Sequence, residues 1–182
     1  MSRNYKILDQ SLPYFVTFTT IYWIDVFTRR CYFDCMIDSF THCIQNKGLI
    51  IYAWCIMTNH VHAIVGTNKI PLQDIIRDMK KYTSKKLIEL IHTNSQESRK
   101  NWMVALFEQA GQRNKNNKRY QFWQQHNQPV ELNNKIIIDQ KLQYIHNNPV
   151  KAGFVNRPED YFYSSAKSYA GITGSVPVVL IE

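Results

Sequence analysis

Residues 49–65, LIIYAWCIMTNHVHAIV, constrain the fold more than any other stretch of the sequence. Residues 49–57 are an almost continuous apolar run, as expected of a buried strand. Residues 60–65 read as a second strand, and the short segment between the two strands is suited to a hairpin turn. Because alternate residues of a strand point to the same face, we expect His60 and His62 to project together from one surface of the sheet.

Residue patterns predict the other elements. Further strands are expected over residues 13–20, which are rich in β-branched and aromatic residues, and over residues 120–123. Helices are expected over residues 29–47 ending at Gly48, from Pro71 onward, over 102–110 ending at Gly111, and over 135–147 ending at Pro149. The helix after Pro71 carries an apolar stripe formed by Leu72, Ile75, Ile76, Met79, Thr83, Leu87 and Leu90. This order predicts an α+β fold, an antiparallel sheet with helices packed on one face.

The length of 182 residues fits one domain, and we expect its core over residues 13–155 and a C-terminal tail over residues 156–182. The four cysteines are too few for a disulfide scaffold and form no C-x-x-C pair, which favours reduced thiols and a cytoplasmic protein. The sequence has no apolar leader and no run of about 18 apolar residues, so we expect no membrane segment.

Positive charge is concentrated in one part of the chain. The net charge is +8, and residues 77–119 hold eleven lysines and arginines against four acidic residues. Such a concentration indicates a surface that binds the phosphates of nucleic acid. The candidate contacts on the helix after Pro71 are Arg77, Lys80, Lys81 and Lys85. A solvated helix face is the alternative interpretation.

Two groups of side chains are candidates for chemistry. The imidazoles of His60 and His62 could bind one metal ion together, although two histidines near a turn also occur by chance. Tyr144 and Asn148 are one helical turn apart and therefore share a face. A helical tyrosine is usually a packing residue with an exposed hydroxyl, so the residues alone leave both roles open for Tyr144.

Taken together, these segments resemble a known family. The stretches WCIMTNHVHAIV, FWQQ, YIHNNPVKAGFV and YFYSSAKSY, with a basic helix after the first, are similar to those of the REP-associated tyrosine transposases. These transposases form part of the single-tyrosine branch of the HUH endonucleases, named for a His, bulky hydrophobic, His element that His60-Val61-His62 matches. The resemblance extends from about Tyr14 to Tyr169 and implies a single HUH-type transposase domain with a ferredoxin-like fold.

The resemblance also implies roles for individual residues. It makes Tyr144 the nucleophile, His60 and His62 metal ligands, and Asn148 the third ligand. It implies a divalent metal, Mg²⁺ or Mn²⁺, and single-stranded DNA that forms a hairpin as the substrate. It further implies a bacterial, nucleoid-associated protein that acts as a monomer or a homodimer. The stretch over residues 93–118 is longer than the resemblance leads us to expect.

The chemistry of these residue types agrees with that reading. A tyrosine phenol has a pKa of about 10 and is a poor nucleophile while protonated. A divalent cation on the scissile phosphate would neutralise its charge and orient it for in-line attack. Two imidazoles and an amide suit Mn²⁺ better than Mg²⁺. Attack would leave a 5′-phosphotyrosine and a free 3′-OH and would require no nucleotide cofactor.

Weaker candidates remain beside these. Tyr82 is an alternative nucleophile and His126 an alternative third ligand, whereas His146 is expected to point elsewhere. His42 and His92 are interpreted as structural or surface residues. Two other functions stay open at this point, a hairpin-binding nucleic-acid-binding protein without catalysis and a structural module whose histidines occur by chance.

Overall fold

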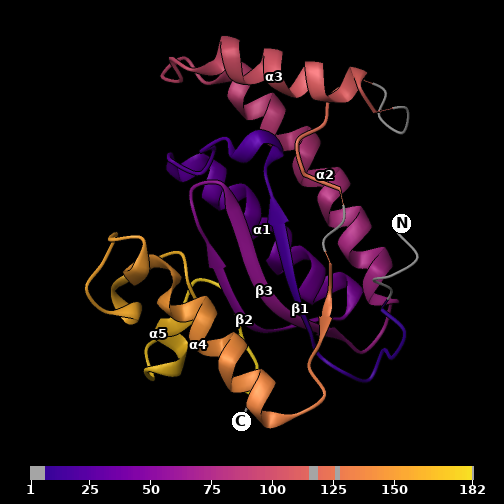
Figure 1. Ribbon diagram of the computed structural model, residues 1–182, viewed down its shortest axis with the longest axis vertical. Helices are drawn as coiled ribbons and strands as arrows, with labels where there is room; N and C mark the ends of the chain where they lie inside the picture. Colours follow the sequence, from indigo (N-terminus) through magenta and orange to yellow (C-terminus); the bar gives the residue numbers. More distant parts are fainter. Residues whose placement is uncertain (1–6, 115–118, 126–127, 182) are drawn as a thin grey trace.

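The computed structural model describes residues 7–114, 119–125 and 128–181 (Figure 1). The strands are β1 (Tyr14–Thr19), β2 (Leu49–Ile56), β3 (His60–Thr67) and β4 (Val130–Glu131). The helices are α1 (Arg30–Lys47), α2 (Leu72–Thr93), α3 (Lys100–Gln112), α4 (Lys135–Lys151) and α5 (Ala166–Tyr169), with short 3-10 helices η1 (Ile21–Trp23) and η2 (Pro158–Asp160). The α+β class predicted from the sequence is confirmed.

The four strands form one antiparallel sheet in the order β2-β3-β1-β4. The predicted hairpin joins β2 to β3, and the Met57 N–H donates to the His60 carbonyl at 2.8 Å to close its turn. Gly48 ends α1 in the left-handed conformation, with φ of 75°, and leads directly into β2. A side chain would be strained at this φ, which explains the glycine.

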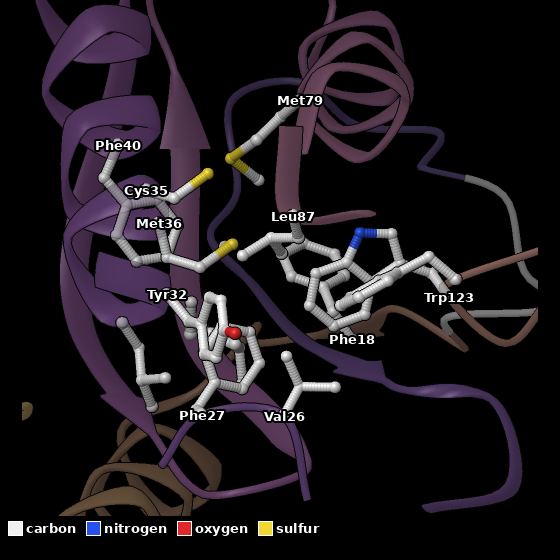
Figure 2. Close-up of a cluster of buried hydrophobic side chains, with 14 of the residues drawn as sticks. Phe18, Val26, Phe27, Tyr32, Cys35, Met36, Phe40, Met79, Leu87 and Trp123 are labelled. Atoms are coloured by element: carbon white, nitrogen blue, oxygen red, sulfur yellow. The ribbon is translucent and has the colours of Figure 1, made fainter. Parts of the chain in front are cut away.

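The main hydrophobic core lies between one face of the sheet and the pair α1 and α2. Figure 2 shows Phe18 from β1, Phe40 from α1 and Leu87 from α2 converging there, all essentially inaccessible to solvent. Trp123, from the segment before β4, closes the same cluster. The helix stripe predicted from the sequence is therefore the surface that α2 buries.

A smaller core lies on the opposite face of the sheet, beneath α4. Phe15, Ala53 and Ile64 project from the strands on this side, and Ile145 of α4 packs on them. Figure 1 shows α4 in front of the sheet and α1 behind it. The prediction of helices on one face holds for α1 and α2 but misses α4. The reason is that the second face is also partly apolar and needs cover.

Three local predictions differ from the structure. Helix α4 continues past Pro149 to Lys151, because Pro149 lies in the last turn, where its missing N–H forfeits one hydrogen bond only. Gly111 lies within α3 and does not end it; a Cβ there would lie 2.1 Å from the Arg119 carbonyl oxygen, so glycine permits a close backbone approach. Residues 120–123 form only a single bridge, between Trp123 and Thr20, and β4 pairs with β1 instead.

The buried stripe of α2 also shifts near its C-terminal end. Leu90 is only partly buried, whereas Ile88 and Ile91 are buried. The row of residues at four-residue intervals that contains Met79 and Leu87 runs on to Ile91, which explains the shift.

The segment after α4 is tied to the outer edge of β2. The Ser165 hydroxyl accepts a hydrogen bond from the Trp54 N–H at 2.9 Å, and the Val179 N–H donates to the Ile51 carbonyl at 2.9 Å. These contacts cover part of a sheet edge that would otherwise present unpaired backbone groups. All four cysteines are free thiols. None of the helices in the described residues combines the length and the apolar character that crossing a membrane would take.

The segment that joins α2 to α3, within the stretch that is longer than the resemblance leads us to expect, is anchored to α1 by a buried carboxylate. Glu97 is 0% exposed and accepts hydrogen bonds from Arg99 Nε at 2.8 Å, Arg29 Nε at 3.0 Å and the Tyr32 hydroxyl at 3.2 Å. The hydrogen bond from Arg99 is the main reason that the pKa of Glu97 falls to about 2. The connection from α2 to α3 is thereby fixed against the start of α1.

We expect Glu97→Gln to lower the free energy of unfolding by about 3 kcal/mol at pH 7, because it removes the buried carboxylate that accepts from the partly exposed guanidinium groups of Arg29 and Arg99. The folded-state pKa lies below the ordinary value of 4.5, so this contribution is complete above about pH 4.5 and is lost as the pH falls toward 2. Urea unfolding at pH 7 and pH 3 checks both statements. Glu89→Gln, which removes an exposed pair with Lys86, should change stability by less than about 0.5 kcal/mol. Equal losses in the two variants would contradict the anchoring role.

Candidate active site

The two histidines of β3 lie side by side on the face of the sheet that α4 partly covers. Their ring centroids are 4.6 Å apart. Val61, between them, points into the main core on the other face. The alternation of the strand therefore brings both imidazoles to one surface, as the sequence predicts.

His62 is held in place with one ring nitrogen left unpaired. Its Nδ1 is 2.8 Å from the Thr17 hydroxyl on the neighbouring strand, and its ring stacks on Phe15 with centroids 5.4 Å apart. His62 is 5% exposed, and its Nε2 is buried with no hydrogen-bond partner. Burial is the main cause that lowers the pKa of His62 to about 3, so the imidazole is neutral at physiological pH.

His60 is oriented by a chain of two hydrogen bonds. Its Nδ1 donates to Asn59 Oδ1 at 2.6 Å, and the Asn59 amide nitrogen donates to Asp25 Oδ1 at 3.0 Å. This arrangement leaves Nε2 as the nitrogen that carries a lone pair. Burial lowers the pKa of His60, and the charge of Asp25 partly opposes that shift.

Tyr144 of α4 lies next to His62, on the same face of the sheet. Its ring centroid is 5.1 Å from that of His62 and 6.0 Å from that of Phe15, and the residue is 42% exposed. The neighbouring Ile145 is fully buried and fixes this face of the helix against the sheet. Helix α4 begins at a cap in which the Asn134 side chain accepts from the Ile137 N–H. Both features hold the phenol beside the histidines.

Asn148 lies one turn after Tyr144 on α4 and is half-buried. The i, i+4 spacing places the two residues on one face of the helix. Among the described residues, no three His, Cys, Asp or Glu side chains gather in a cluster that could hold a metal ion. A third protein ligand of another type is therefore needed if the pair binds metal, and an amide oxygen is such a donor.

Lys141 is a member of this site that sequence reasoning missed. Its Nζ lies 4.6 Å from the centroid of the Phe15 ring and 5.8 Å from that of the Tyr144 ring. Its charge also contributes to lowering the pKa of His62. The signal was available, because Lys141 precedes Tyr144 by three residues and so shares its side of the helix. Thr17, Asn59 and Asp25 were missed as well, since their roles depend on contacts between separate segments.

The residues present fit a divalent metal ion. A buried imidazole nitrogen without a partner is costly unless a ligand or metal satisfies it, and His62 Nε2 is such an atom. The Nδ1 contacts of both histidines direct their Nε2 atoms toward a ligand, which is the usual outer-shell arrangement of metal-binding histidines. The combination of two neutral imidazoles, a phenol and a lysine suits a reaction at a phosphate group.

The family of the chain is decided by its sequence. A family model described as Transposase IS200 like matches residues 10–109, more than half of the chain. The chain belongs to the IS200-like transposase family. The match includes His60 and His62 and ends before α4, which carries Tyr144.

A solved structure of a REP-associated tyrosine transposase bound to a REP hairpin has the same fold as this family member. The alignment covers 100% of this chain and 94% of that one, with a TM-score of 0.65 and 16% sequence identity. The similarity therefore extends through α4 and the C-terminal segment. A comparison with curated proteins gave no match.

The basic residues predicted to contact DNA lie apart from the histidines in this transposase fold. They belong to α2, which packs on the opposite face of the sheet. Arg77, Lys81 and Lys85 are exposed there, and Arg77 pairs with Asp74 and Asp78. The structure separates Lys80 from them: it is half-buried and its Nζ donates to the Gln124 carbonyl at 3.0 Å.

The weaker candidates are placed as follows. Tyr82 is exposed on α2, on the far side of the sheet from the histidine pair. His146 is buried with its Nε2 2.9 Å from the Ser165 hydroxyl, so it points away from the site as expected. His126 lies outside the described residues.

Proposed function

We propose that the protein cleaves and rejoins single-stranded DNA with Tyr144 as the nucleophile and with a divalent metal held by His60, His62 and Asn148. The observation that supports this most strongly is the unpartnered, buried Nε2 of His62, in a ring that lies 5.1 Å from the exposed ring of Tyr144. A packing role alone does not explain the unsatisfied nitrogen.

The proposed reaction is a transesterification. The Tyr144 hydroxyl oxygen attacks the scissile phosphorus, and the bond from phosphorus to the 3′ oxygen breaks. The 3′ oxygen leaves with the electron pair and ends as a hydroxyl once the phenolic proton has been transferred, so a 5′-phosphotyrosine and a free 3′-OH result. The number of phosphodiester bonds is conserved, and the step is reversible without a nucleotide cofactor.

When bound, Mg²⁺ or Mn²⁺ supplies charge neutralisation at the phosphate, and the two imidazoles and the amide favour Mn²⁺. The protein's own groups do the remaining work in this proposal. Thr17 and Asn59 hold the two imidazoles in their ligand orientation. The Lys141 ammonium, beside the Tyr144 ring, contributes a positive charge that would stabilise the bound phosphate and the negative charge that develops on the phenol oxygen.

The substrate is proposed to be single-stranded DNA that carries a hairpin. The solved relative of the same fold is bound to a hairpin, and the family is a transposase family. The exposed basic residues of α2 give a second surface for the phosphate backbone, on the opposite face of the sheet.

The test is incubation of the protein with hairpin-bearing single-stranded DNA and Mn²⁺, followed by a denaturing gel. The expected result is a covalent protein–DNA band together with a free 3′-OH fragment, and both should disappear with EDTA. Retention of the hairpin on a native gel without any covalent band would favour the alternative of a hairpin-binding protein without catalysis. Absence of retention even at low salt would contradict both functions.

The basic face of α2 should make DNA binding depend on salt concentration. We expect Lys81→Gln and Lys85→Gln each to reduce the magnitude of the slope of log K against log salt by roughly 0.7 to 0.9. The reason is that a variant with one phosphate contact fewer releases fewer counterions when it binds DNA. Arg77→Gln should reduce it less, since Asp74 and Asp78 already compete for that guanidinium. Binding titrations between roughly 50 and 200 mM salt measure the slope. An unchanged slope in the Lys81 and Lys85 double variant would show that this face is only solvated.

A further inference from the structure

A strained corner of the chain, Tyr22-Trp23 in η1, lies next to the histidine pair. Both residues adopt the left-handed conformation, with φ of 55° for Tyr22 and 56° for Trp23. Bulky aromatic residues rarely occupy this region, and strain of this kind is concentrated at functional sites. No glycine relieves the turn, so the two side chains are retained at a cost in backbone energy.

The strain does not serve to bury these rings. Trp23 is 58% exposed and Tyr22 is exposed as well, whereas the following Ile24, Val26 and Phe27 are buried. The corner is nevertheless fixed at both ends: the Ile21 N–H donates to the Phe122 carbonyl at 2.7 Å, and the Phe27 N–H donates to the Thr58 carbonyl at 2.8 Å. A rigid segment therefore presents two aromatic rings to solvent.

The position of Trp23 links it to the proposed chemistry. Its ring centroid is 5.9 Å from that of His60, which is in turn 4.6 Å from His62. Trp23 therefore contacts His60, whereas Tyr144 contacts His62. A DNA strand whose phosphate lies between the histidines and Tyr144 needs a place for its neighbouring base, and Trp23 presents an exposed ring next to His60.

An open hollow of about 480 Å³ continues from the corner on the Tyr22 side. It is lined by Tyr22 and by the polar side chains of Arg113, Asn114, Gln121 and Gln125, from the C-terminal end of α3 and the segment after it. Guanidinium and amide groups of this kind can contact phosphates and base edges. The C-terminal end of α3, with Arg113 and Asn114, thus helps to form the surface next to the corner.

We propose that Trp23, supported by Tyr22, is a stacking platform for an unpaired nucleobase of the DNA strand next to the scissile phosphate. The inference rests on the proposed function and names a base-binding subsite within it. Stacking on an aromatic ring suits single-stranded DNA of any sequence, because every base has a π-face. The fixed backbone of the corner lowers the entropy lost on binding.

The experiment compares two probes of equal length and charge, an oligothymidylate of twelve nucleotides and an abasic chain with the same phosphates. Binding is measured by fluorescence anisotropy in EDTA for the wild type, Trp23→Ala, Trp23→Phe and Trp102→Ala. Trp102 on α3 is a matched control, since it is 47% exposed and lies outside the site. The measurement does not depend on catalysis.

We expect Trp23→Ala to weaken binding of the oligothymidylate by roughly 5- to 100-fold and to leave binding of the abasic chain unchanged. Trp23→Phe should keep most of the affinity, and Trp102→Ala should resemble the wild type on both probes. The stacking role of Trp23 is contradicted if Trp23→Ala binds the oligothymidylate as tightly as the wild type does. It is also contradicted if the substitution weakens binding of both probes equally. A covalent adduct of the wild type with unchanged Trp23→Ala binding would contradict the platform alone. A base-dependent loss without any adduct in the wild type would contradict the nuclease alone.

Discussion

Tyr144→Phe is expected to abolish the covalent protein–DNA adduct and the free 3′-OH product, a loss of more than about a thousandfold in cleavage rate. The substitution removes only the attacking oxygen and keeps the ring that packs beside Phe15 and His62. The free energy of unfolding should therefore change by less than about 0.5 kcal/mol. Hairpin affinity should stay within a few-fold of the wild type.

The matched control is Tyr82→Phe. Tyr82 is the other exposed tyrosine that sequence reasoning offered as a nucleophile, and it lies on the opposite side of the sheet. It should keep most of the cleavage activity in the same denaturing-gel assay. Adduct formation by Tyr144→Phe together with its loss in Tyr82→Phe would reverse the assignment of the nucleophile.

His62→Ala should remove both cleavage and metal-induced stabilisation. In the wild type, Mn²⁺ at 100 times its dissociation constant should raise the free energy of unfolding by about 2.7 kcal/mol. The variant lacks the proposed ligand atom, the His62 Nε2 that is unpartnered in the structure, so this increase should disappear. Thermal unfolding with and without Mn²⁺ measures the effect without any DNA present.

His60→Ala should also stop cleavage, with partial recovery at high Mn²⁺ through the remaining ligands. Tyr144→Phe should show no such recovery at any metal concentration, because the attacking atom is missing. His42→Ala, on the exposed side of α1, is the control and should keep the full Mn²⁺ response. A His62→Ala variant that Mn²⁺ stabilises as strongly as the wild type would show that the metal binds elsewhere.

Much of the fold follows from local patterns in the sequence. The period of two in β3 placed His60 and His62 on one face, and the apolar stripe of α2 identified its buried side. Gly48 ended α1 as predicted because its positive φ is a local requirement. These features depend on neighbouring residues only, which is why the sequence is sufficient to predict them.

Other features depend on contacts between distant segments. The position of α4 on the second face is set by Phe15, Ala53 and Ile64 from three strands, and no local pattern in α4 reveals it. Pro149 was wrongly predicted to end α4, since the rule for proline is a bias that a buried last turn overrides. The basic residues of α2 were recognised by charge, but charge does not reveal which face of the sheet their helix covers.

The site was predictable in its residue types and less so in its surroundings. Tyr144 and the histidines lie together as the resemblance implies, and their chemical roles remain predictions. Thr17 and Asn59 contact the histidines, and Asp25 contacts Asn59. Those contacts exist only once β1, the hairpin turn and the segment after η1 are packed together. Trp23 gave no sequence signal because its importance lies in an unusual backbone conformation.

The most direct test of the central claim is to map the residue that carries DNA in the wild-type adduct. The covalent complex formed with hairpin-bearing single-stranded DNA and Mn²⁺ is digested with nuclease and trypsin and then sequenced by tandem mass spectrometry. Trypsin releases residues 142–151, which contain Tyr144, and residues 82–85, which contain Tyr82. We predict a nucleotide 5′-phosphate on Tyr144 and an unmodified Tyr82. A nucleotide on any other residue, or no adduct although the hairpin is bound and Mn²⁺ is present, would contradict the account.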